Sequence, residues 1–210
     1  MNPRLPRILL LATAAFLAAL LGARALMPGR SAPPVLERAV WLPGGSPLPE
    51  VAFVDESGAP FDARRLQGRW TYVFFGFASC PDICPTTLAT LATVRSTLRD
   101  LPTELRPDVL LVTVDPSRDD PTRLAPYVRH FDPAFHAVTG DEASLARLAS
   151  ALGAAYARVP LTGGGYTMDH TSRLFLIGPD GRLVATSGAP HDAEVIARDH
   201  RVLVARGTDN

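Results

Sequence analysis

The sequence predicts an α/β domain of three layers, built on a central mixed β-sheet. Two nearly unbroken apolar runs, Trp70–Phe77 and Val109–Val114, are typical of central strands that are buried on both faces. Between these runs, apolar residues recur at helical spacing, at Leu88, Leu91, Val94 and Leu98. The chain has 210 residues, which suits one domain of ordinary size and an appendage.

The first 27 residues are expected to form a targeting segment. Arg4 and Arg7 precede an apolar run over residues 8–23, and Arg24 follows it. At ~1.5 Å per residue a helix over this run spans roughly 24 Å, slightly less than a bilayer core of about 30 Å. The segment therefore fits either a cleaved signal peptide or an uncleaved membrane anchor, and both predict export of the rest of the chain.

Residues 28–49 are rich in Pro and Gly and lack periodicity, which predicts a semi-rigid linker. The folded domain is expected over residues 50–206. With 21 basic and 21 acidic residues the formal net charge is zero, which argues against binding to nucleic acid. All 21 basic residues are Arg, and this composition suggests a GC-rich bacterial genome.

Two further helices are predicted from capping signals in the middle of the domain. Asp120 followed by Pro121 indicates an N-cap and a first-turn proline, opening a helix towards Arg129. Thr139 and Glu142 are spaced as a capping box ahead of a helix that Gly153 ends.

The C-terminal part of the domain predicts a hairpin and a last helix. Strands are expected at Arg173–Ile177 and Leu183–Thr186, on either side of the turn signal Pro179–Gly181. A helix then fills Asp192–Val204. This order of strands and helices fits a thioredoxin-like sheet.

The two cysteines of the chain lie at the junction between the first buried strand and the first helix. Cys80 and Cys84 are separated by Pro81, Asp82 and Ile83, and ligands gather at such junctions in open α/β sheets. A helix N-terminus favours thiolate over thiol, and a spacing of four places both side chains on one helical face. The pair therefore has the features of a reactive or metal-binding site.

Three kinds of chemistry are considered for this pair: a redox dithiol, a structural zinc site and a copper site. A redox dithiol of the thioredoxin type normally has a two-residue spacer, and here there are three residues. A structural zinc site takes four ligands, usually with further Cys or His nearby. Copper(I) is soft, prefers thiolate, and is satisfied by two thiolates and one imidazole.

His170 is the candidate imidazole among the five histidines. It follows the Gly-rich stretch Gly163–Gly165 and immediately precedes the strand Arg173–Ile177, a pattern typical of a mobile functional loop on a rigid scaffold. In a thioredoxin-like sheet this strand neighbours the one that leads to Cys80, so His170 can reach the cysteine pair. The other four histidines, His130, His136, His191 and His200, are interpreted as surface or helix-end residues.

Two acidic residues are candidates for groups that contact the metal ligands without binding the metal themselves. Asp169 can orient the His170 ring or balance charge. Asp115 ends the second strand and is expected at the same edge of the sheet as the cysteines. Asp119 and Asp120, further along the same turn, are interpreted as turn and capping residues.

Three segments together resemble the Sco/SenC family: Cys80–Pro85, Asp115–Pro121 and Tyr166–Ser172. The resemblance covers roughly Pro49 to Arg206. It implies a thioredoxin-like fold that binds one copper ion, Cu(I) or Cu(II), through Cys80, Cys84 and His170, with the segment before His170 as a flexible loop. It further implies a metallochaperone role in assembly of the CuA centre in subunit II of cytochrome c oxidase.

The resemblance also implies an alternative role, a thiol-disulfide oxidoreductase that keeps the cysteines of the oxidase copper site reduced. This alternative needs only Cys80 and Cys84 as the redox pair. A peroxidase is a weaker reading, because no resolving cysteine lies outside the pair. The expected partners are subunit II, a copper donor and a thiol reductant. The expected location is the bacterial inner membrane, with the domain in the periplasm on a single N-terminal anchor or released by cleavage.

Overall fold

The computed structural model describes residues 13, 16–17 and 33–207. The predicted targeting segment, residues 1–27, lies outside the described residues except for positions 13, 16 and 17. Within the described part of the chain, no helix combines the length and apolar character needed to cross a bilayer.

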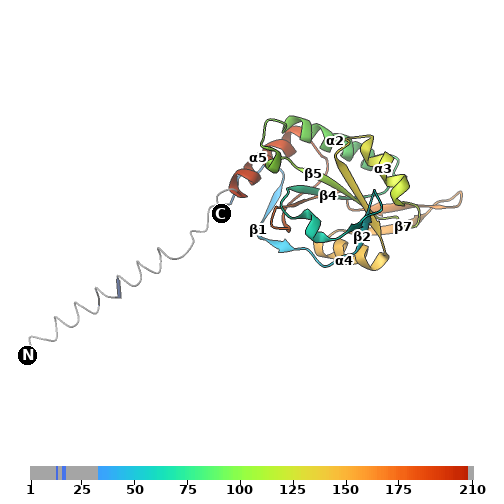
Figure 1. The fold of residues 1–210 in the computed structure, drawn as a ribbon, viewed down its shortest axis with the longest axis horizontal. Helices are drawn as coiled ribbons and strands as arrows, with labels where there is room; N and C mark the ends of the chain where they lie inside the picture. The colour runs from blue at the N-terminus through green and yellow to red at the C-terminus, as the bar shows by residue number, and fades with distance from the viewer. Residues whose placement is uncertain (1–12, 14–15, 18–32, 208–210) are drawn as a thin grey trace, which may run out of the picture. The chain divides into compact units, whose positions relative to one another are not determined.

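The domain is built on one eight-stranded mixed sheet (Figure 1). Its centre is a parallel trio in the order β4 (Thr71–Gly76), β5 (Asp108–Thr113) and β6 (Phe135–Gly140). All other neighbours are antiparallel. On the β4 side they are β9 (Leu174–Ile177), β10 (Arg182–Ser187) and β1 (Val40–Pro47), and on the β6 side β2 (Phe53–Asp55) and β3 (Pro60–Phe61).

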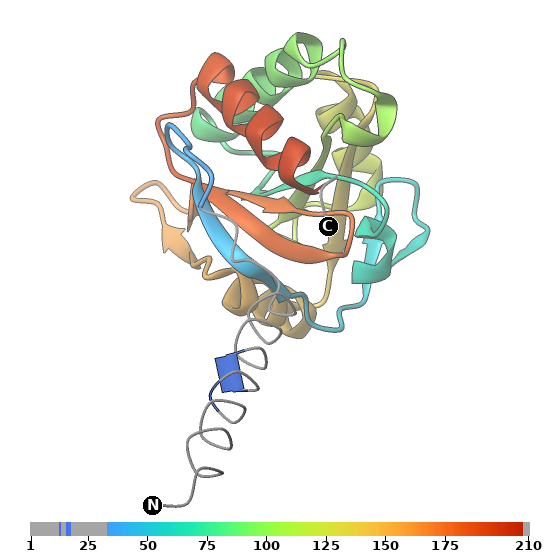
Figure 2. The ribbon, with the colours of Figure 1, turned by 90° about the vertical axis from the view of Figure 1, so that its left-hand side faces the viewer.

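Helices cover both faces of this sheet (Figures 1 and 2). One face carries α2 (Ile83–Thr97), α3 (Pro121–Arg129) and α5 (Ala193–Gly207), and the other carries α4 (Glu142–Leu152). Successive residues of a strand face opposite layers. Tyr72 of β4 accordingly faces Leu203 of α5, whereas Val73 faces Leu148 and Leu152 of α4. Every residue of β4 is buried. The prediction of a three-layer α/β domain with a mixed sheet is confirmed.

The capping predictions have mixed outcomes. The Asp120 carboxylate caps α3 by accepting from the Arg123 N–H at 2.9 Å, and Gly153 ends α4 with a left-handed φ of 69°, both as predicted. The capping box at Thr139 is wrong, because Thr139 lies inside β6. The cap of α4 is Asp141, whose Oδ1 accepts from the Ser144 N–H at 2.7 Å.

The segment predicted as a linker, residues 28–49, differs from expectation in its second half. Val40–Pro47 form the edge strand β1, which pairs with β10. Its register shifts where Gly44 and Gly45 adopt positive φ, and the Arg182 guanidinium donates to both of their carbonyls. An irregular edge strand tolerates Gly and Pro that a central strand excludes, so composition concealed it.

The chain just before β1 is held by one buried carboxylate. Asp199 of α5 accepts from the backbone N–H groups of Glu37, Arg38 and Ala39 at 2.7, 3.0 and 2.8 Å. Residues 37–39 are therefore part of the domain rather than of a linker.

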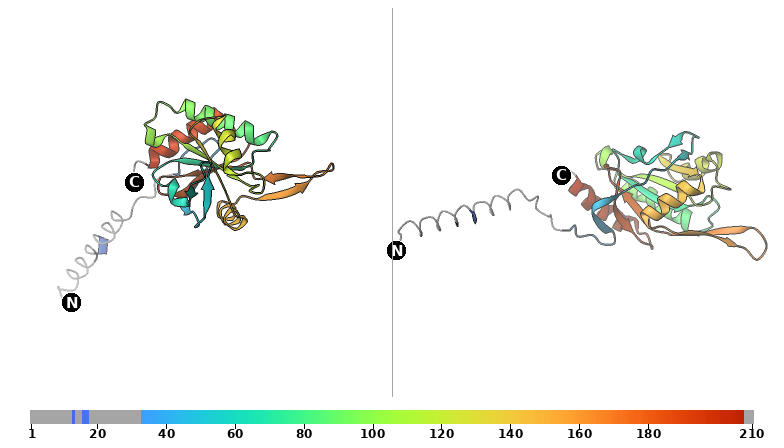
Figure 3. Two further views of the ribbon diagram at one scale, coloured as in Figure 1. Left: turned by 45° about the vertical axis from the view of Figure 1, so that its right-hand side comes forward. Right: turned by 90° about the horizontal axis from the view of Figure 1, so that it is seen from below.

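The segment before His170 is a β-hairpin rather than the predicted loop. β7 (Tyr156–Pro160) pairs with β8 (Tyr166–His170) in a separate two-stranded sheet, and Gly164 and Gly165 turn the chain at its tip with positive φ. Figure 3 shows this hairpin extending away from the body of the domain. His170 is the last residue of β8, at the end of the hairpin remote from that tip.

Candidate metal centre

The two cysteines lie where the chain passes from β4 into α2. Cys80 is in the connecting turn and Cys84 is the second residue of α2. The Cys84 N–H donates to Cys80 Sγ at 3.4 Å, so the helix start faces the first sulfur. The approach is close enough to need Gly76, because a Cβ at this position would lie 3.0 Å from Cys84 Sγ.

His170 reaches the pair from the other segment. Its Nε2 lies 3.4 Å from Cys84 Sγ, and its Nδ1 lies 3.2 Å from the Thr171 carbonyl oxygen. A carbonyl only accepts, so this contact assigns the proton to Nδ1 and leaves the Nε2 lone pair facing the thiols. The rings of Phe74 and Phe77 contact the imidazole edge-on, with centroids at 5.8 and 5.9 Å, and limit its rotation.

The two thiols are electrostatically unequal. A hydrogen bond with the Cys84 side chain, supported by backbone hydrogen bonds from Cys84 and Asp82, outweighs burial and lowers the pKa of Cys80 to about 4. The same contact with Cys80, together with burial, raises the pKa of Cys84. Cys84 is fully buried, whereas Cys80 is 9% exposed. At neutral pH the pair therefore consists of a Cys80 thiolate and a Cys84 thiol.

These three residues form a group that fits a single metal ion. One ligand atom from each of Cys80, Cys84 and His170 lies within 4.8 Å of the other two. Ligand atoms about 2.3 Å from a shared ion are about 4 Å apart in a trigonal arrangement. The structure thus brings together the three ligand candidates that the sequence predicts, without a fourth among the described residues.

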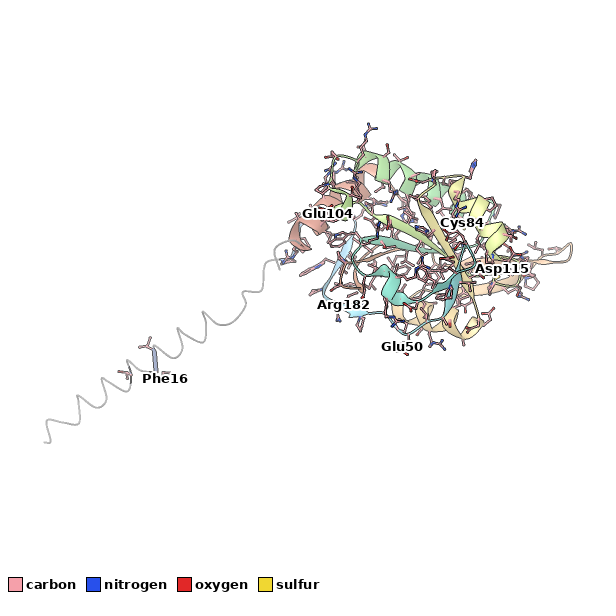
Figure 4. All side chains as sticks on the ribbon, viewed as in Figure 1. Phe16, Glu50, Cys84, Glu104, Asp115 and Arg182 are labelled. Atoms are coloured by element: carbon pink, nitrogen blue, oxygen red, sulfur yellow. The ribbon has the colours of Figure 1, made fainter. Side chains whose placement is uncertain are left out.

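Asp115 lies near this end of the domain but supports the hairpin, not the sulfurs (Figure 4). It is buried, and its carboxylate accepts from the Tyr166 hydroxyl at 2.8 Å and from Arg118 Nε. Arg118 Nη1 also donates to the Tyr166 carbonyl, and the guanidinium groups of Arg118 and Arg158 lie 3.8 and 4.1 Å from the Tyr166 ring centroid. Tyr166 begins the strand that His170 ends, so Asp115 acts on the ligand through β8.

Asp169 does not join the group. It is exposed, and neighbouring residues on a strand point to opposite sides, so its side chain faces away from that of His170. Among the described residues its carboxylate has no hydrogen-bond partner or ion pair. The geometry gives no contact through which Asp169 orients the imidazole ring.

Asp119 is a residue that sequence reasoning missed. It is fully buried, and its Oδ2 accepts from the Ala78 N–H at 2.9 Å and from the Thr113 hydroxyl at 2.7 Å. Ala78 lies two residues before Cys80, so this carboxylate fixes the turn that carries the first thiol. Burial raises the pKa of Asp119. Its spacing from Asp115 and Asp120 resembled ordinary turn chemistry, and only the fold reveals its contact with the cysteine turn.

Residues 49–205 match the family model described as SCO1/SenC. The chain belongs to the SCO1/SenC family. A putative copper-binding protein of Stutzerimonas stutzeri is 40% identical over 151 residues, which are 71% of this chain and 72% of that protein. Across this relative and its Rickettsia counterparts, the matched regions span 63–72% of the relatives' length.

Solved structures of Sco proteins share the fold. Bradyrhizobium japonicum ScoI with copper bound is 30% identical, with a TM-score of 0.65 over 74% of this chain and 98% of that chain. BsSco, a member of the Sco family of cytochrome c oxidase assembly proteins, is 21% identical, with a TM-score of 0.58 over 76% and 94% of the two chains. The resemblance to Sco/SenC and the thioredoxin-like fold predicted from the sequence are confirmed.

Proposed function

We propose that this Sco/SenC protein binds one copper ion through Cys80 Sγ, Cys84 Sγ and His170 Nε2 and delivers it during assembly of the CuA centre of cytochrome c oxidase. The observation that carries the proposal is the convergence of two sulfurs and one imidazole nitrogen, with the imidazole lone pair facing the sulfurs. Thiolate and imidazole ligands suit copper, and a three-ligand set leaves room for exchange with an acceptor.

The softness of the ligands favours Cu(I), because thiolate is a ligand that this ion prefers. The resting pair carries one negative charge, on Cys80, and arrival of Cu(I) would displace the proton of Cys84. The contact between Nδ1 and the Thr171 carbonyl turns Nε2 of His170 toward the sulfurs, where it can act as the third ligand. The hairpin supplies His170 separately from the turn and helix that supply the sulfurs, which gives the site one ligand that can withdraw without unfolding α2.

The decisive measurement is a Cu(I) titration of the reduced full chain in detergent, without oxygen, against a competing chelator. One tight equivalent in the wild type should be weakened by about 100-fold or more in Cys80→Ser, Cys84→Ser and His170→Ala, because each removes one of three ligands. His130→Ala is the matched control, because His130 is an exposed residue that caps the C-terminal end of α3, and this variant should bind as the wild type does. Unchanged affinity in His170→Ala would sink the three-ligand site.

A second candidate function is reduction of a disulfide in the acceptor protein. The inequality of the thiols favours it, since a Cys80 thiolate beside a Cys84 thiol is the arrangement that attacks a disulfide and then resolves the mixed disulfide. This reaction needs no imidazole ligand. His170→Ala should therefore retain disulfide reduction while losing copper affinity, whereas loss of both activities would indicate that one site geometry serves both.

The proposed partners and location follow from the family and the N-terminal sequence. We propose subunit II as the acceptor, an unidentified copper donor and thiol reductant, and a periplasmic domain attached to the inner membrane by residues 1–27. Fractionation of cells and N-terminal sequencing of the mature protein test the location. A mature N-terminus after position 24 would replace the anchor with a cleaved signal, and recovery of the intact chain from the cytoplasm would refute export.

A further inference from the structure

A second cleft lies at the end of the sheet opposite the cysteines. It has a volume of about 400 Å³ and is lined by the first residues of β4 and β5, Thr71 and Asp108. Cys80 follows the carboxyl end of β4. Because β4 and β5 are parallel, their first residues lie at the opposite end of the sheet from the cysteines. Figure 4 shows Glu104, in the turn that borders this cleft, well away from Cys84.

Guanidinium groups dominate the cleft, which we call the arginine cleft. Its lining has four arginines, Arg65, Arg69, Arg95 and Arg106, against two carboxylates, Asp55 and Asp108. Asp132, outside the lining, also accepts from Arg95 and reduces the surplus to one positive charge. The chain as a whole has zero net charge, so the surplus is a local feature. Clefts that gather charge of one sign focus their field on a ligand.

The ion pairs in the cleft leave most guanidinium donors uncommitted. Arg65 donates to Asp55 at 2.6 Å and Arg69 donates to Asp108 at 2.8 Å, each through Nη1. An arginine has five N–H donors, and Nε and Nη2 of both residues have no partner among the described residues. Arg69 is 61% exposed, so its free edge is accessible from solvent.

Arg106 is the arginine of the cleft that has no direct ion pair among the described residues. It is half-buried, its Nε donates to the Leu101 carbonyl at 2.7 Å, and within the described chain no carboxylate lies within ion-pair distance of it. The carboxylate of Asp100 interacts with Arg106 only at longer range and is paired directly with Arg201, so an anion in the cleft would give Arg106 a direct partner.

We propose that the arginine cleft binds a phosphate group carried by a small molecule. The planar forks of Arg69 and Arg106 match phosphate oxygens in pairs, and the volume falls in the range of small-ligand sites. The same chemistry has two sources, a soluble phosphate monoester and the phosphodiester headgroup of an anionic lipid. Neither source involves the cysteines, so the proposal is independent of copper binding.

The test is a ³¹P NMR titration of the full chain in a phosphate-free detergent near pH 7.5. Glycerol 3-phosphate represents the soluble monoester and glycerophosphoglycerol represents the lipid headgroup, each against sodium chloride at equal ionic strength. We expect saturable broadening with at least one probe, and an affinity at least tenfold weaker in both Arg69→Gln and Arg106→Gln. Arg64→Gln is the matched control, because Arg64 lies beside Arg65, is 84% exposed and pairs with Asp62 outside the cleft.

The outcomes separate the sources and decide the proposal. Stronger binding of glycerol 3-phosphate assigns a soluble ligand, and stronger binding of glycerophosphoglycerol assigns a lipid headgroup. Absence of saturable binding by both probes overturns the proposal, as does an equal loss in Arg64→Gln. Arg69 is largely exposed, so Arg69→Gln reports on the cleft even if Arg106→Gln fails to fold. Wild-type affinity in Arg69→Gln also overturns the proposal.

Discussion

Acidification should destabilise this domain through one buried histidine. His200 of α5 is fully buried, its Nε2 donates to the Leu105 carbonyl at 2.8 Å, and its Nδ1 lies 3.4 Å from the Tyr72 hydroxyl. Burial lowers its pKa from 6.5 to about 4. Between these two values the unfolded chain binds a proton that the native chain does not, so stability is lost as the pH falls.

The size of the loss follows from the two pKa values. A difference of about 2.5 pKa units corresponds to about 3 kcal/mol once the pH is below about 4, and to about 2.5 kcal/mol at about pH 4.5. The loss is absent above about pH 7, where both forms are neutral. Because the imidazole is enclosed by protein, solvent screening does not reduce this figure greatly.

Urea unfolding of the wild type and of His200→Gln, at steps from about pH 7.5 to 4.5, measures this contribution. The glutamine amide retains a donor for the Leu105 carbonyl and does not titrate. The free energy of unfolding of the wild type should fall by about 2.5 kcal/mol more than that of the variant over this interval. His191, whose pKa is also lowered by burial, contributes equally to both proteins and cancels. Parallel pH profiles would refute the assignment.

Three further substitutions test the framework around the proposed copper site. Asp119→Asn weakens the anchor on the Ala78 N–H and should lower Cu(I) affinity about 10- to 100-fold in the chelator competition, without removing a ligand; wild-type affinity would contradict that role. Gly76→Ala places a Cβ 3.0 Å from Cys84 Sγ and should lower the free energy of unfolding in urea by about 1–3 kcal/mol and also weaken copper binding. Asp199→Asn removes one of the oxygens that hold the chain before β1 and should cost about 1.5–3 kcal/mol, with faster proteolysis of that segment. A stability change below about 0.5 kcal/mol in either of the last two would count against its contact.

The predictable part of the fold is the part that burial dictates. β4 is buried throughout and β5 is buried from Val109 onward, so their residues there are mostly apolar or small, and an apolar run results. β1 lies at the sheet edge and contains two glycines in left-handed conformations, so its sequence has no such apolar run. β6 mixes an exposed His136 with buried neighbours, so it has no continuous apolar run.

The candidate site likewise contains residues that the sequence predicts and one, Asp119, that it does not. The spacing of Cys80 and Cys84 is local, and a strand followed by a helix was enough to place both thiols at the sheet end. His170 could be predicted because the strand after it pairs with β4, as the structure shows. The role of Asp119 depends on where Ala78 lies once the sheet has formed, and no local pattern encodes that contact.

The two cysteines and His170 differ in how they couple copper binding to folding. Two of the three proposed ligands are four residues apart and stay together in the unfolded chain, whereas His170 is brought to them by β8, β9 and the contact between Asp115 and Tyr166. A ligand stabilises the native state only by the difference between its native and unfolded affinities. Copper should therefore stabilise the fold mainly through the His170 bond, so the increase in Tm on copper binding should nearly vanish in His170→Ala although its dithiol still binds the ion.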